Sequence, residues 1–194
     1  MSSKYITRLE NALAAYLALA LCLFLFILFY NITAGYELGD HGFYLLHIRQ
    51  PENITHTITH FGLAWNFLIG EHTIVGNRRA NICMIIFCSF SVVFVAALVS
   101  RRQIKTLDVL KGMFVAAAAS SSYFASFILD PSYNAIALMV VLFGVALIAI
   151  GIEAELRGSR RVALSIAGIV GTLMALLVLT KASTAIAFSV FIFL

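Results

Sequence analysis

Residues 12–30 read ALAAYLALALCLFLFILFY, and none of these 19 side chains is charged. About 20 mostly apolar residues in a helix are enough to cross the hydrocarbon core of a bilayer. A secretory signal has a shorter apolar core of about 7–15 residues, so the stretch favours a retained membrane helix. It therefore predicts an integral membrane protein whose first span lies close to the N-terminus.

The composition of the whole chain agrees with this class. Apolar residues make up 62% of the 194 residues and charged residues 11%, whereas a soluble domain is about half apolar and a quarter charged. The net charge of +4 is small for this length and gives no reason to expect nucleic acid as a partner. The three cysteines lie inside apolar runs without CxxC spacing, which indicates packing residues rather than a metal or disulfide framework.

Four more apolar stretches have the length of a span, at residues 82–100, 112–129, 134–152 and 162–180. A sixth run, residues 184–194, is shorter, and the sequence stops inside it. We therefore expect an all-α fold, a single multispan transmembrane helix bundle over residues 1–194. We also expect this chain to be the N-terminal part of a longer protein.

Lysine and arginine give the expected orientation, since these residues concentrate in cytoplasmic loops. With a cytoplasmic N-terminus, nine of the 13 basic residues fall inside and only four outside. The four outer ones are Arg49, Arg78, Arg79 and Lys181. The outer side then holds a long loop at residues 31–81 and a short turn beginning at Asp130.

The long outer loop is rich in apolar residues and is not a linker. In the segment HFGLAWNFLIGE, Phe61, Trp65 and Leu68 would share one side of a helix. A short amphipathic helix with a tryptophan is typical of the membrane interface. A helix packed on top of the bundle is the alternative, and the sequence favours neither.

Two acidic residues, Asp40 and Asp130, fall on the outer face. Apolar surroundings raise the pKa of a carboxyl group, which makes it a better general base near neutral pH. Each residue could instead cap a helix, Asp40 near Gly42 and Asp130 near Pro131, and the spacing around Asp40 favours the cap.

The histidines of the outer loop suggest a metal site, but only weakly. His56 and His60 are four residues apart and would share a helical face. The segment HTITH lacks the glutamate of the HExxH motif, and no cysteine lies nearby. We therefore expect polar, solvated histidines and no bound metal.

The order of these features resembles the N-terminal half of GT-C glycosyltransferases. The features are a short cytoplasmic N-terminus, one span, a long outer loop opening with ELGDHGFYLL, the next outer turn DPSYN, and LTK after the fifth span. The resemblance in topology covers nearly the whole chain. The resemblance in sequence motifs depends mainly on three residues, Asp40, Asp130 and Lys181. It implies a GT-C-like bundle with interfacial helices in the first outer loop.

The resemblance also implies an enzyme that transfers a sugar from a polyprenyl-phosphate-linked donor to an acceptor that the sequence does not identify. The implied catalytic residues are the two acids, with Asp40 as the base. The cations Arg78, Arg79 and Lys181 would bind the donor phosphate. The implied acceptor-binding residues are Glu37, His41, Tyr133 and Asn134. His41 stands where the family has a second acid, so no cofactor is expected.

Two other functions fit the same pattern. The chain could be a non-catalytic membrane subunit or scaffold of a cell-envelope pathway, with the apolar outer loop as its contact surface. It could also be a transporter, although none of the five spans carries a charge at its centre. In each case we expect a multi-pass protein of the bacterial inner membrane, surrounded by membrane lipids.

Overall fold

The computed structural model describes residues 3–33, 40–53, 59–70, 73–100, 104–126 and 129–193. Within these ranges all regular structure is helical, which confirms the predicted all-α class there. The elements are α1 (Ser3–Tyr30), η1 (Asn31–Thr33), α2 (Asp40–Arg49), η2 (Pro51–Asn53), α3 (Phe61–Leu68), α4 (Ile74–Val99), α5 (Thr106–Ser121), η3 (Ser122–Ser126), α6 (Tyr133–Leu156) and α7 (Arg160–Phe193).

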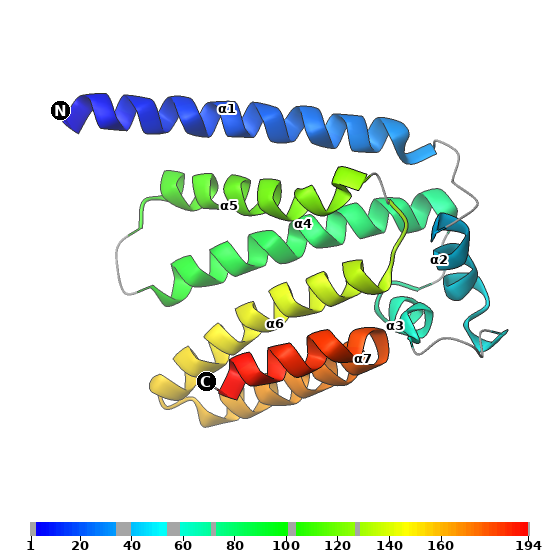
Figure 1. Cartoon of the computed structure of the whole chain (residues 1–194). Coiled ribbons are helices and arrows are strands. Elements are labelled where there is room, and N and C mark those ends of the chain that lie inside the picture. Colours follow the sequence, from blue (N-terminus) through cyan, green and yellow to red (C-terminus); the bar gives the residue numbers. More distant parts are fainter. Residues whose placement is uncertain are drawn as a thin grey trace.

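Four helices in the described ranges are long and apolar enough to cross a membrane. They are Arg8–Thr33, Ile74–Val99, Tyr133–Leu156 and Arg160–Ile192. These helices support the predicted membrane protein. In Figure 1 the long helices lie side by side, and the chain runs back and forth along them.

The helix α5 differs from the span expected at residues 112–129. It has 16 residues and ends at Ser121, where the chain passes into the 3₁₀ helix η3. The Ser122 hydroxyl donates to the Ala119 carbonyl at 2.6 Å, a local bond of the kind that competes with a continuing helix. Figure 1 shows α5 and η3 together returning the chain from the end of α4 to the start of α6.

The helix α7 is two arms that fold back at Lys181. The backbone of Lys181 is extended, with φ −157° and ψ 87°, so the helix is interrupted there. In Figure 1 the first arm, residues 160–180, runs toward α3, and the second arm, residues 182–193, returns beside it. Both arms pack on α6, since Gly151 faces Ile166 and Gly144 faces the Phe188 ring. The apolar runs at 162–180 and 184–194 are thus separate helices.

The short helices α2 and α3 lie across one end of the long helices, which we call the α2/α3 end (Figure 1). One side of α3 is buried through Phe61, Ala64 and Trp65. The other side is apolar and open, with Leu63 50% and Phe67 71% exposed. The helix α3 is thus packed on the long helices through one side, as one of the two alternatives has it, and its other side is apolar and open.

Candidate functional site

The α2/α3 end contains a buried ion pair between α4 and the turn before α6. Arg78 donates from Nε to Asp130 Oδ1 at 2.9 Å and from Nη2 to Oδ2 at 3.1 Å. A third donor, Nη1, binds the Ile32 carbonyl at 3.0 Å. Arg78 is 2% exposed and Asp130 0%, so the two charges face each other and are closed to solvent. Two-point pairing of this kind is the strong form of an arginine–carboxylate contact.

The start of α4 is polar and buried around this pair. Asn77 accepts a hydrogen bond from the Trp65 indole at 3.0 Å, and Asn81 donates to the Leu129 carbonyl at 2.9 Å. Arg79 points the other way and is exposed. Of the two neighbouring arginines, Arg78 therefore stabilises the fold, and the exposed Arg79 is accessible to a ligand.

The turn before α6 is capped by a serine. The Ser132 hydroxyl accepts from the backbone N–H of Ala135 at 3.2 Å, which is the usual geometry of an N-cap. The suggested cap by Asp130 is therefore wrong, because its carboxylate is turned inward to Arg78.

Lys181 forms a second polar group at the same end. Its Nζ donates to Asn134 Oδ1 at 2.7 Å and lies 5.7 Å from the centroid of the Tyr133 ring. The break in α7 places this side chain over the start of α6. The ring of Tyr133 packs edge-on against Tyr44 of α2 and Phe61 of α3, with centroids 6.2 Å away in both cases. Lys181 is half-buried and has further N–H donors for an anion.

A pocket with hydroxyl groups in its lining lies between α5, η3 and α6. It has a volume of about 340 Å³, and its polar lining is Ser120, Ser122 and Tyr123. The Tyr123 hydroxyl lies 2.5 Å from that of Ser132. The pocket also touches Leu138, which is one turn along α6 from Asn134, or about 6 Å. Two of the three consecutive serines 120–122 thus line this open pocket.

The expected base, Asp40, is the first residue of α2, but its side chain lies outside the described residues. The same holds for the side chain of His41, and Glu37 lies wholly outside. One turn after Asp40 comes Tyr44, whose ring contacts Tyr133 beneath Lys181. The backbone of α2 therefore begins close to the lysine group.

The expectation of solvated histidines is wrong for His47. Its ring is 2% exposed, stacks on Phe61 at 4.8 Å and binds the Phe43 carbonyl through Nδ1 at 3.0 Å. The residues around His47 are apolar, and this pattern could have predicted that the ring is buried. Within the described ranges, no three His, Cys, Asp or Glu residues lie close enough together to hold a metal ion.

The chain was compared with known proteins. No family model, no curated protein and no solved structure matches it.

Proposed function

We propose that this chain is part of an integral membrane glycosyltransferase that uses a polyprenyl-phosphate-linked sugar, as its resemblance to GT-C enzymes implies. The observation that supports this most is Lys181, a half-buried cation held by Asn134 where the helices α6 and α7 meet the α2/α3 end. A lysine at the end of a span reaches the depth of lipid head groups, where it can bind a phosphate. In this proposal the α2/α3 end faces outward and the N-terminus is cytoplasmic, in the bacterial inner membrane.

The proposed chemistry is a single displacement. An acceptor hydroxyl attacks the anomeric carbon, and Asp40 takes its proton. The bond between this carbon and the phosphate oxygen breaks, and the polyprenyl phosphate leaves with the electron pair. Lys181 and Arg79 stabilise the charge on the leaving phosphate.

The other residues of the site have supporting roles in this proposal. Glu37, His41, Tyr133 and Asn134 surround the acceptor. Arg78 and Asp130 compensate each other's charge, and in this proposal they stabilise the structure of the site.

Lys181→Met is expected to raise KM for the lipid-linked donor about tenfold, the effect of losing one charge-assisted hydrogen bond of roughly 1.5 kcal/mol. The measurement is transfer of a labelled sugar by the full-length protein in proteoliposomes at several donor concentrations. The matched control is Lys111→Met, because Lys111 makes the equivalent contact to Asn11, at 2.8 Å, between α1 and α5. An equal KM in both variants would remove Lys181 from donor binding.

Asp40→Asn is expected to lower kcat about 10²- to 10⁴-fold, the usual contribution of a general base, and to leave KM for the donor nearly unchanged. Single-turnover transfer at saturating donor measures the chemical step. Asp108→Asn is the control, since Asp108 is an exposed acid in the first turn of α5. Transfer at the original rate by Asp40→Asn would contradict its role as base.

A second function, a non-catalytic membrane subunit, is favoured by the open side of α3. Leu63 and Phe67 form an exposed apolar edge there, and such an edge suits contact with another protein as well as with lipid. A full-length protein that neither binds the donor nor transfers sugar would favour this function over the enzyme.

A further inference from the structure

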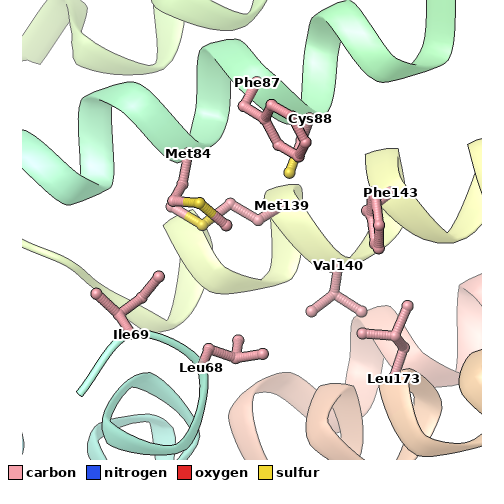
Figure 2. Close-up of a pocket in the computed structure, with 9 residues that line it drawn as sticks. All are labelled: Leu68, Ile69, Met84, Phe87, Cys88, Met139, Val140, Phe143 and Leu173. Atoms are coloured by element: carbon pink, nitrogen blue, oxygen red, sulfur yellow. The ribbon is translucent and has the colours of Figure 1, made fainter.

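An apolar cavity of about 130 Å³ lies between four helices, away from the lysine group. Figure 2 shows its lining, which comes from α3, α4, α6 and α7. The nine lining residues are Leu68, Ile69, Met84, Phe87, Cys88, Met139, Val140, Phe143 and Leu173. Six of these side chains are pure hydrocarbon, and the other three carry sulfur.

The three sulfur residues reach the cavity from two facing helices. Met84 and Cys88 are four residues apart on α4 and so share one side of that helix. Met139 comes from α6, and in Figure 2 its side chain points toward Met84, while Cys88 borders the same cavity. Three of nine lining residues contain sulfur, against eight of 194 in the chain, so sulfur is concentrated here.

The cysteine thiol is well placed to be a ligand. Cys88 is 3% exposed, and no hydrogen bond to its thiol is seen within the described ranges. The lining offers no nitrogen or oxygen from a side chain, so the sulfur atoms are its side-chain donors. Thiolate and thioether groups are soft ligands that select Cu(I), Zn and Fe–S clusters, and of these only the single charge of Cu(I) is balanced by one thiolate.

We propose that Met84, Cys88 and Met139 form a binding site for one Cu(I) ion. On binding, the Cys88 thiol releases its proton to water and the thiolate sulfur bonds to copper, with no change of oxidation state. The two thioethers complete a three-sulfur coordination. One thiolate cancels the single positive charge of Cu(I), so the complex is neutral and avoids the large cost of a net charge among apolar side chains.

The cavity itself distinguishes this site from ordinary packing. Methionine and cysteine often fill gaps in an apolar core, but here they border about 130 Å³ of free space. That is several times the roughly 10–15 Å³ that one water needs in the same measure, so the cavity has room for a single ion. Ile69, directly after α3, also lines the cavity and is half-exposed.

The test is Cu(I) binding by the purified full-length protein, measured without oxygen in competition with a colorimetric Cu(I) chelator. We expect one tightly bound ion per chain and one proton released with it. Cys88→Ser and Cys88→Ala should abolish tight binding. Met84→Leu and Met139→Leu keep the side-chain volume. Each should lower the affinity for Cu(I) more than about tenfold, because even residues that only contact a metal ligand change metal affinity on that scale when they are mutated.

Matched controls come from the exposed cysteines, Cys22 and Cys83. Cys22→Ser and Cys83→Ser should keep the bound ion, and X-ray absorption at the copper edge should show sulfur ligands only. Thermal unfolding of each variant separates loss of the site from loss of the fold. If the folded Cys88→Ala variant bound Cu(I) with unchanged stoichiometry or affinity, the proposal would be overturned. The three sulfur-containing side chains would then have a packing role only. Because sugar transfer is measured without copper, either proposal can fail without the other.

Discussion

Arg78→Ala lowers the free energy of unfolding by about 3–5 kcal/mol, because it removes the charge that faces the buried carboxylate of Asp130. At least three hydrogen bonds are lost together, two to Asp130 and one to the Ile32 carbonyl. These bonds connect the end of α1, the start of α4 and the turn before α6. Unfolding of the purified protein in detergent micelles by a denaturant measures the change.

Two further variants isolate the ion pair. Arg79→Ala removes the exposed neighbouring arginine and should change stability by less than about 0.5 kcal/mol. The double variant Arg78→Met with Asp130→Leu removes both charges and should be more stable than Arg78→Ala alone, since no isolated charge remains. If Arg78→Ala were as stable as Arg79→Ala, the pair would not be what holds this end together.

Gly62→Ala displaces α3 from α2. A Cβ on Gly62 would overlap the backbone carbonyl of His47, and a backbone group cannot rotate away as a side chain can. Overpacking costs about 1–3 kcal/mol where the surroundings adjust, and we expect the upper end or more here. The single tryptophan, Trp65, is fully buried on α3, so its fluorescence should shift to longer wavelength as water reaches it.

The control for Gly62→Ala is Gly42→Ala on α2. A Cβ on Gly42 meets nothing within 4 Å, and alanine in a helix is favoured over glycine by about 0.5–1 kcal/mol. This variant should be as stable as the original protein or more so. An unchanged Trp65 emission in Gly62→Ala would show that α2 and α3 do not approach as closely as described.

Long apolar runs made the main helices predictable. Residues 12–30 and 134–152 lie inside α1 and α6, because a run of that length can form little else in a bilayer. The break at Lys181 was also visible, as a charge between two apolar runs. The helix α5 was harder to place, because the apolar run continues past Ser121, where the helix ends and the chain passes into η3.

The pairing of charges could not be read from the sequence. Arg78 and Asp130 are 52 residues apart, and periodicity says which side of a helix a residue faces but not which loop it meets. Taken as isolated charges at the membrane rim, Arg78 and Asp130 fitted roles in donor binding and catalysis as well as they fitted an ion pair. The choice between Arg78 and Arg79 likewise depended on the rotation of α4, which places one inward and one outward.

The separation of Arg78 and Asp130 also has a consequence for biogenesis. Ribosomes add about 5–20 residues per second, so Arg78 is made roughly 3–10 s before the carboxylate 52 residues later that neutralises it. During that interval the Arg78 side chain cannot form its two hydrogen bonds to the Asp130 carboxylate. The bond between Arg78 and Asp130 can therefore form only after α5 and the turn before α6 have been made, so the contact between the start of α4 and this turn is completed after α4 itself has been synthesised.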